Sequence, residues 1–259
     1  MLKPLVLVTN DDGITAPGIY HLWKALQGKY RLAVMAPQDQ QSVAGLSLST
    51  RSTLYLNKVD WHDETNAWSL SGTPADCVKM ALNTLGEVPS LIVSGVNQGS
   101  NAGRNVLYSG TVGGVIEGTL RGIPGVAFSC RNYDAPNYSV AEQFIPAIVS
   151  YVFQHPLPAG TLLNVNFPDG PNTLPKGFKL TRQGLDYWFP HAHEQASGEY
   201  FYSALEEQQF EEHPESDIFW LNQGFITAVP IHVNELTDHS HLEQSKSHFE
   251  AMFPVEGGK

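Results

Sequence analysis

The chain has 259 residues, and its 15 Lys and Arg residues against 26 Asp and Glu residues give a formal net charge of −11. This charge excludes a general nucleic-acid-binding surface, because neutralising phosphates requires clustered cations. A content of 42% hydrophobic and 16% charged residues excludes a disordered chain and supplies enough apolar side chains for one large domain or two small ones.

The first apolar run covers residues 5–8 and stops at Thr9 and Asn10. A membrane-spanning helix needs roughly 20 mostly apolar residues, and the run is also too short for the core of a signal peptide. Cys77 and Cys130 are too few for a disulfide framework, so we expect buried thiols in a reducing compartment. These features predict a cytoplasmic protein that is not inserted into a membrane.

Strand-like and helix-like patterns alternate along the first 167 residues, which is typical of an α/β fold with parallel strands. Thr73 is expected to cap a helix that begins at Pro74. In chain order we expect a strand at residues 5–9, a helix at 18–26, a strand at 31–36, a hairpin formed by 54–57 and 67–70, a helix at 74–85, a strand at 91–94, a helix at 111–120, a strand at 125–129, a helix at 140–154 and a strand at 162–167.

The pattern changes after Pro168. Short strand-like segments at residues 178–181 and 200–204, punctuated by Gly, Pro and Asn, are expected to form the arms of hairpins. The acidic stretch at residues 205–216 is expected to be a solvated loop or the end of such an arm. A returning strand at residues 225–231 and an amphipathic helix at residues 240–253 follow. We therefore divide the chain into a core (residues 1–168) and an accessory region (residues 169–259).

Two neighbouring carboxylates follow the first expected strand. Asp11 and Asp12 repel each other, so they favour a shared cation, and Gly13 lets the backbone turn sharply beside them. Loops after two other strands offer Ser42 and Asn97 as oxygen donors. Because the carboxyl ends of parallel strands meet at one edge of a sheet, we expect these loops to converge. Each loop taken alone is equally typical of an ordinary turn.

A second set of residues is typical of an anion site. Asn101 lies in a glycine-rich loop, and Ser109, Gly110 and Thr111 stand where a helix begins. Free N–H groups and the positive end of the helix dipole bind phosphate at such a position. Ser109 or Thr111 would serve equally well as a simple helix cap.

The candidate ligands together favour a hard cation. Carboxylate, hydroxyl and amide oxygens suit Mg²⁺, Mn²⁺ or Ca²⁺ better than Zn²⁺. A hard cation beside an anion site indicates phosphate chemistry, because the cation polarises a phosphoryl oxygen while backbone amides stabilise the charge that develops. The all-oxygen set consists of Asp11, Asp12, Ser42 and Asn97.

Six sequence blocks support a more specific interpretation. They are LVTNDDG (7–13), APG (16–18), SGTPADCV (71–78), SGVNQGSN (94–101), YSGTVG (108–113) and LNVNFP (163–168). In these blocks and their order the chain resembles the SurE family, the stationary-phase survival proteins that act as metal-dependent nucleoside monophosphate phosphatases. The loop around Ser42 departs from the usual family pattern, with Gln38-Asp39 before the serine and Val43 directly after it.

The resemblance implies a Rossmann-like, mostly parallel sheet flanked by helices. It also implies a C-terminal arm of hairpin and helix that subunits of a homodimer or homotetramer exchange. The implied substrates are nucleoside 5′-monophosphates, with 3′-monophosphates and short polyphosphates as a further range, and no stable nucleic-acid or membrane partner.

The resemblance also assigns site residues. One divalent cation per subunit, Mg²⁺ or Mn²⁺ with Ca²⁺ as a substitute in crystals, would bind Asp11, Asp12, Ser42 and Asn97. The substrate phosphate would lie among Asn101, Ser109, Gly110 and Thr111. Asp11 and Asp12 are the candidate catalytic residues, as a base for an attacking water or as a nucleophile.

Several other functions are weighed against this interpretation. Spacing excludes a zinc protease motif at His191 and His193, and no serine hydrolase, dinucleotide-binding or P-loop motif occurs. Adjacent aspartates also fit poorly to a glycosidase, whose carboxyls face each other across a bond. The alternative of a different class is a non-catalytic sensor that binds nucleotide or phosphate through the same residues without hydrolysing it.

Overall fold

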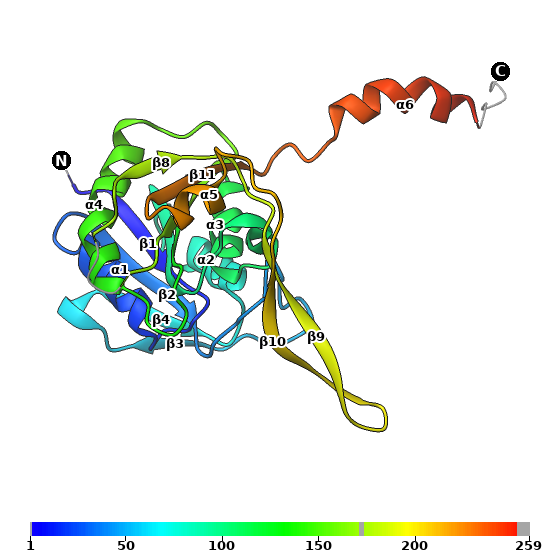
Figure 1. The fold of residues 1–259 in the computed structure, drawn as a ribbon. Helices are drawn as coiled ribbons and strands as arrows, with labels where there is room; N and C mark the ends of the chain where they lie inside the picture. The colour runs from blue at the N-terminus through cyan, green and yellow to red at the C-terminus, as the bar shows by residue number, and fades with distance from the viewer. Residues whose placement is uncertain (1, 171–173, 253–259) are drawn as a thin grey trace, which may run out of the picture.

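The computed structural model describes residues 2–170 and 174–252, and its centre is a twisted, mostly parallel sheet with helices on both faces (Figure 1). Within the described residues, the order of strands across this sheet is β3-β4-β2-β1-β5-β6-β7-β11-β8. The strands are β1 (Leu5–Thr9), β2 (Arg31–Pro37), β3 (Leu56–Val59), β4 (Asn66–Leu70), β5 (Leu91–Gln98), β6 (Gly125–Cys130), β7 (Thr161–Phe167), β8 (Phe178–Leu180) and β11 (Ile226–His232).

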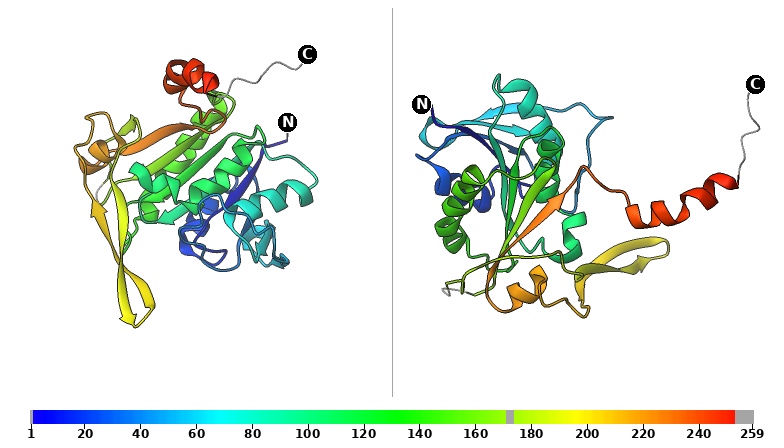
Figure 2. Two further views of the ribbon diagram at one scale, coloured as in Figure 1. Left: turned by 90° about the vertical axis from the view of Figure 1, so that its right-hand side faces the viewer. Right: turned by 90° about the horizontal axis from the view of Figure 1, so that it is seen from above.

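Helices α1 (Pro17–Leu26) and α4 (Tyr138–Gln154) cover one face of the sheet, and α2 (Pro74–Thr84) and α3 (Gly110–Thr119) cover the other (Figures 1 and 2). Successive residues of a strand point to opposite faces, so one strand contributes side chains to the hydrophobic core on each face of the sheet. Val6 and Val8 of β1 pack in the cluster that contains α1 and α4, whereas Leu5 and Leu7 pack in the cluster that contains α2.

The fold class expected from the sequence is confirmed. Each strand and helix expected before residue 168 is present, with bounds that shift by a few residues. Thr73 caps α2 in a capping box, because its hydroxyl accepts from the N–H of Asp76 (3.1 Å) and the carboxylate of Asp76 accepts from the N–H of Thr73 (3.0 Å). The expected hairpin is also present, with β3 antiparallel to β4.

The region after residue 168 differs in part from expectation. The segment 178–181 was expected to be a hairpin arm, but β8 pairs in parallel with β11 at the edge of the main sheet. The ring of Phe178 packs edge-on against Phe144 of α4, with 5.5 Å between centroids, which holds β8 against the core. Two strands thus continue the sheet beyond residue 168, and the division of the chain at that residue stays a prediction.

A long antiparallel hairpin projects from the sheet (Figure 1). It consists of β9 (Tyr187–Ala196) and β10 (Glu199–Gln208), which confirms the expected arm at residues 200–204. Of the two alternatives for residues 205–216, the end of an arm is confirmed for residues 205–208, which continue β10. The expectation is wrong at the other end, because buried Ser216 caps α5 (Asp217–Asn222), a short helix that the sequence pattern did not indicate.

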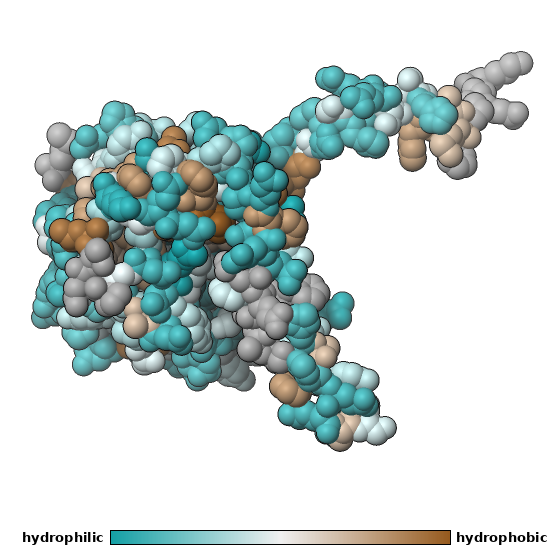
Figure 3. All heavy atoms as spheres, viewed as in Figure 1, coloured by the Kyte–Doolittle hydropathy of each residue, from teal (hydrophilic) through white to brown (hydrophobic). Residues whose placement is uncertain are grey.

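The last helix, α6 (His239–Ala251), extends away from the sheet (Figures 1 and 2). It was expected to run to Phe253, which lies outside the described residues. None of its residues is buried. Leu242, Phe249 and Met252 are exposed, and Figure 3 shows brown spheres among the teal ones toward the C-terminal end of this helix. In the described part of the chain, every helix is too short or too polar to cross a bilayer.

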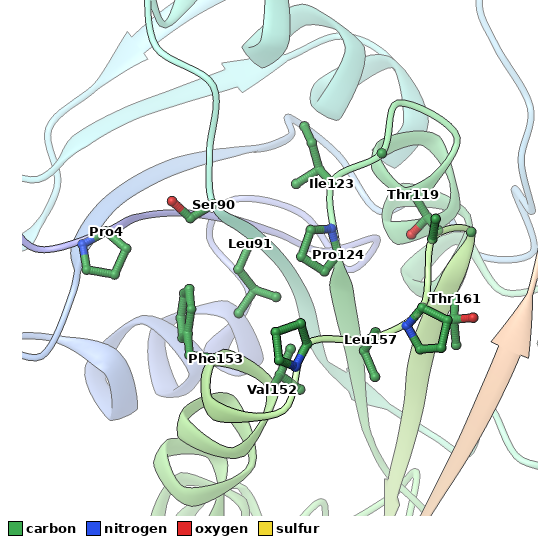
Figure 4. A pocket seen from close by; sticks show the side chains of 15 residues that line it. Pro4, Ser90, Leu91, Thr119, Ile123, Pro124, Val152, Phe153, Leu157 and Thr161 are labelled. Atoms are coloured by element: carbon green, nitrogen blue, oxygen red, sulfur yellow. The ribbon is translucent and has the colours of Figure 1, made fainter.

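The amino ends of the strands surround a cavity of about 460 Å³ (Figure 4). Its lining is mostly apolar and includes Pro4, Leu91, Pro124, Phe153 and Leu157. Leu91 begins β5, and Pro124 directly precedes β6. The polar loops singled out from the sequence follow the opposite, carboxyl ends of the strands.

Candidate active site

The loops after β1 and β5 meet at the carboxyl edge of the sheet. The two strands pair in parallel, with Thr9 opposite Ser94. The backbone N–H of Gln98 donates to Oδ2 of Asp12 at 3.2 Å, so the second aspartate lies beside the end of β5. Gly13, with φ of 101°, makes the turn after the aspartates. Asp11 and Asp12 therefore converge with the segment that carries Asn97, as expected, although Asn97 belongs to the end of β5 and not to a loop after residue 94.

The side chain of Asn97 is held in one orientation. Its Nδ2 donates to the carbonyl oxygen of Gly99 at 2.8 Å. This hydrogen bond assigns the amide orientation and leaves the carbonyl oxygen Oδ1 as the donor atom for a cation. Coordination of a cation by this oxygen stays a prediction.

The loop after β2 brings Ser42 to the same edge. The N–H of Gln41 donates to the backbone carbonyl of Asp11 at 2.7 Å, which ties this loop to the first aspartate. Ser42 itself is exposed, and its hydroxyl accepts from Nε2 of Gln40 at 2.9 Å. Its role as a cation ligand stays a prediction.

The N-terminus of α3 faces Asp11. The hydroxyl of Thr111 donates to Oδ1 of Asp11. A Cβ placed on Gly110 would lie only 3.0 Å from Oδ2 of Asp11, so the absence of a side chain at Gly110 permits this approach. Ser109 caps the helix by accepting from the N–H of Val112 at 3.1 Å. The cap and the anion site are compatible, since the cap uses an N–H deeper in the first turn.

Asp11 is buried and Asp12 is half-buried. Burial is the main cause that raises the pKa of Asp11 and the charge of Asp12 also raises it, whereas the hydroxyl and N–H of Thr111 lower it, so that the pKa is about 7. Burial also raises the pKa of Asp12, against the hydrogen bond from Gln98. Two neighbouring carboxylates that are removed from water repel each other when no cation lies between them. Such a pair is typical of a site that binds a cation.

Two side chains of β7 form hydrogen bonds with the backbone N–H and carbonyl groups of Asn101. Its N–H donates to Oδ1 of Asn166 at 2.9 Å, and its carbonyl oxygen accepts from Nδ2 of Asn164 at 2.7 Å. Its own amide points inward, toward the hydroxyls of Ser129 (2.8 Å) and Thr111 (3.4 Å). Asn101 was expected to offer this amide to the phosphate; here the amide connects β6 with the residue that contacts Asp11.

Asn164 and Asn166 were not among the residues expected at the site. The available signal was an amide at alternate positions of a strand that is otherwise mostly apolar. All of β7 is buried, and a buried amide must find hydrogen-bond partners. The two asparagines therefore mark where the glycine-rich loop rests on the sheet.

The candidate cation site has no histidine or cysteine. Among the residues that the structure describes, no group of three or more His, Cys, Asp or Glu side chains is arranged to hold a metal. Two carboxylates, an amide oxygen and a hydroxyl would leave coordination positions for water, as Mg²⁺ and Mn²⁺ prefer. The donor chemistry and the close approach of Gly110 to Asp11 both fit a hard cation next to a helix N-terminus.

Known proteins are similar to this chain in sequence and fold. The family described as "Survival protein SurE" matches residues 6–190. A protein of Protochlamydia amoebophila (strain UWE25) named 5′-nucleotidase SurE is 48% identical over 256 residues, or 96% of this chain and 98% of that protein. A Moorella thermoacetica protein of the same name is 38% identical over 98% of this chain and 100% of that protein. The crystal structure of the SurE protein from Aquifex aeolicus is similar with a TM-score of 0.82 and 33% identity, covering 95% of this chain and 100% of that chain.

Proposed function

Because the chain belongs to the SurE family, we propose that it is a metal-dependent phosphomonoesterase that hydrolyses nucleoside 5′-monophosphates to nucleosides and phosphate. The relatives named 5′-nucleotidase SurE support the nucleotidase activity. One structural observation carries the chemistry: Asp11 lies against the N-terminus of α3, so a carboxylate pair and a set of helix N–H groups share one edge of the sheet.

Asp11, Asp12, Ser42 and Asn97 are the proposed cation ligands, and one divalent ion per subunit would bind them. When bound, Mg²⁺ or Mn²⁺ supplies positive charge that polarises a phosphoryl oxygen and acidifies water. Ser109, Gly110 and Thr111, at the N-terminus of α3, would lie around the phosphate, where the positive end of the helix dipole stabilises its negative charge. Asn101 keeps Thr111 in place through its side-chain amide.

In the proposed reaction a water oxygen forms a bond to phosphorus while the ester P–O bond breaks. The nucleoside oxygen leaves and takes up a proton. Asp11 and Asp12 have two alternative roles: one carboxylate accepts the proton of the water, or one attacks phosphorus and is released by water in a second step. Trapping a phosphorylated enzyme, or finding none during turnover, decides between these routes.

We further propose that the arm after residue 168 joins subunits into a homodimer or homotetramer. The exposed residues Leu242 and Phe249 of α6, with Met252 directly after it, support this, because none of the described residues of this helix is buried and an exposed apolar stripe favours contact with a second chain. The proposed location is the cytoplasm, and the two free, buried cysteines are compatible with a reducing compartment.

The decisive experiment measures phosphate release from nucleoside 5′-monophosphates by the purified protein, with Mg²⁺ or Mn²⁺ and after chelation. We expect turnover that a chelator abolishes and the metal restores. Nucleoside 3′-monophosphates and short polyphosphates define the substrate range in the same assay. Binding of nucleotide without any release of phosphate would instead support the non-catalytic sensor.

A matched pair of variants makes this test specific. Asp12→Asn removes one proposed ligand charge, whereas Asp60→Asn removes an exposed carboxylate directly after β3. We expect Asp12→Asn to lose activity and to require more metal for half-maximal rate, with Asp60→Asn unchanged. Equal activity of the two variants at limiting metal would contradict the proposed ligand set.

A further inference from the structure

The accessory region contacts the segment that leads to the phosphate site. The short helix η2 (Gly103–Leu107) begins two residues after Asn101 and ends just before Tyr108 and Ser109. The N–H of Gly103 donates to Oδ2 of Asp217 at 3.0 Å, and its carbonyl oxygen accepts from the side chain of Gln183. Both partners come from beyond residue 168.

Further hydrogen bonds join η2 to the base of the hairpin. The N–H of Arg104 donates to the carbonyl oxygen of Asp186 at 2.9 Å, and Oδ1 of Asn105 accepts from the N–H of Trp188 at 2.9 Å. Gly103 has φ of 58°, and a Cβ at this position would overlap the carbonyl oxygen of Asp186. This close packing fixes η2 against the hairpin base.

Asp217 is the central acceptor of this contact and is completely buried (0% exposed). Its Oδ1 accepts from the N–H groups of Gly184 (2.8 Å) and Ile218 (2.9 Å). Its Oδ2 accepts from Gly103 and from Nε2 of Gln183 (3.2 Å). Oδ1 therefore binds only the accessory region, whereas Oδ2 joins the accessory region, through Gln183, to η2.

A carboxylate in this position is costly. Removing a charge from water is unfavourable unless hydrogen bonds replace the solvent. The donors to Asp217 are neutral amides, and burial raises its pKa to about 6. A helix cap alone would not require this burial, because Ser216 already caps α5 by accepting from the N–H of Phe219 at 3.1 Å.

The geometry points to Asp217 as a positioning residue for phosphate binding, which acts by holding Gly103 and thereby the segment from Asn101 to Thr111. That segment is anchored at its start by Asn164 and Asn166 of the sheet and at η2 by Asp217. The accessory region then contributes to the catalytic site of its own chain. The inference rests on the proposed function, since it concerns binding of the substrate phosphate.

Asp217→Asn tests this role selectively. The side-chain Oδ1 of asparagine can still accept from Gly184 and Ile218, but its NH₂ group would face the N–H of Gly103, donor against donor. The loss of this bond is expected to raise KM for a nucleoside 5′-monophosphate about tenfold. The inhibition constant of inorganic phosphate should rise in parallel, with kcat reduced less than about threefold.

Glu212→Gln is the matched control. Oε1 of Glu212 accepts from the N–H groups of Leu185 and Asp186 at the same hairpin base, so these hydrogen bonds stay within the accessory region. We expect KM and the phosphate inhibition constant of this variant to stay within about twofold of wild type. A fall in kcat with unchanged KM in Asp217→Asn, or equal effects in both variants, would show a general structural role and overturn the inference.

Hydrogen exchange provides a readout independent of activity. The backbone amides of residues 103–108 should exchange faster in Asp217→Asn than in Glu212→Gln or wild type. If wild type releases no phosphate, the proposed function fails, while the exchange comparison still decides whether Asp217 holds η2. Unchanged exchange in this segment would refute the anchor.

A second variant covers the case in which Asp217→Asn does not fold. Gln183→Ala removes the other side-chain bond to Gly103 from a partly exposed position. It should raise KM and accelerate exchange of residues 103–108 in the same direction, to a smaller extent. Wild-type values for both quantities would contradict the inference.

Discussion

Gly110 and Asp11 touch across the edge of the sheet: a Cβ at Gly110 would lie 2.9 Å from Cβ and 3.0 Å from Oδ2 of Asp11. The first residue of α3 is thus fitted to the carboxylate that follows β1. The carbonyl oxygen of Gln41 closes the same space at 3.2 Å from that position. Three loops that are far apart in the sequence therefore share one contact at the site.

This contact predicts the effect of Gly110→Ala. The added methyl group must displace the Asp11 carboxylate or the helix terminus, and overpacking of this kind lowers stability by about 1–3 kcal/mol. Because the displacement moves a proposed catalytic group relative to the phosphate, kcat/KM should fall roughly 10- to 100-fold. Steady-state kinetics, with a melting curve to confirm folding, measures the effect. An alanine variant with wild-type kcat/KM would show that the spacing of Gly110 and Asp11 does not matter for turnover.

Asp11→Asn should lower activity without lowering thermal stability. Loss of the charge weakens the proposed cation site, and we expect kcat/KM to fall by about a thousandfold at limiting metal. In the chelated protein the same change removes a buried charge, so the melting temperature near neutral pH should be equal or higher. Kinetics at limiting Mn²⁺ and thermal unfolding with chelator provide the two measurements. Turnover near that of wild type, or a marked loss of thermal stability, would contradict the assigned role.

Asn166→Ala tests the support of the glycine-rich loop by β7. The substitution leaves the buried N–H of Asn101 without its acceptor, at a cost of about 1–3 kcal/mol. We expect a lower free energy of unfolding together with weaker phosphate inhibition. Asn57→Ala, at an exposed position of strand β3, is the control and should change neither quantity. Identical behaviour of the two variants would argue against the support.

Much of this site could be predicted from the sequence, because the candidate cation ligands follow or end parallel strands that are neighbours in the sheet. Asp11, Asp12 and Asn97 each follow or end a parallel strand, and β1 neighbours β5 in the sheet. Alternation of strands and helices is sufficient to expect such loops at one edge. Likewise the pattern of Thr73, Pro74 and Asp76 specifies a helix start locally, through hydrogen bonds within one turn.

The partners of Asn101 and Gly103 could not be predicted in this way. Their hydrogen bonds reach Asn166 and Asp217, which lie 65 and 114 residues further along the chain. Neither a propensity nor a spacing rule links residues at such separation. The same holds for β8, whose three residues take their place from β11 and Phe144 rather than from a local pattern.

Asp217 also predicts a pH dependence of stability. Its pKa is about 6 in the folded chain against an ordinary value of 3.8, with the charge of Glu212 adding to the effect of burial. Between these pH values the folded chain keeps a proton that the unfolded chain releases, so this group's contribution to the free energy of unfolding falls as pH rises. From about pH 5 to about pH 7.5 the contribution should fall by about 1–1.5 kcal/mol.

Urea unfolding of wild type and Asp217→Asn at both pH values isolates this contribution. The difference in unfolding free energy, wild type minus variant, should decrease at the higher pH, because the asparagine does not titrate. Other carboxylates titrate in both proteins and cancel in the difference. A difference that is constant or grows with pH would show that the Asp217 carboxylate is not destabilised by burial.

The apolar stripe of α6 predicts how subunits associate. Leu242 and Phe249 are seven residues apart, so they lie on one face of the helix, and both are exposed in the single chain. Replacing both with aspartate should reduce the mass measured by light scattering from that of an oligomer toward 28.4 kDa. Aspartates at Gln244 and Ser247, on the opposite face, add the same charge and should leave the oligomer intact. An oligomer that persists in the first variant would place the subunit contact elsewhere, and a monomeric wild type would refute the proposed assembly.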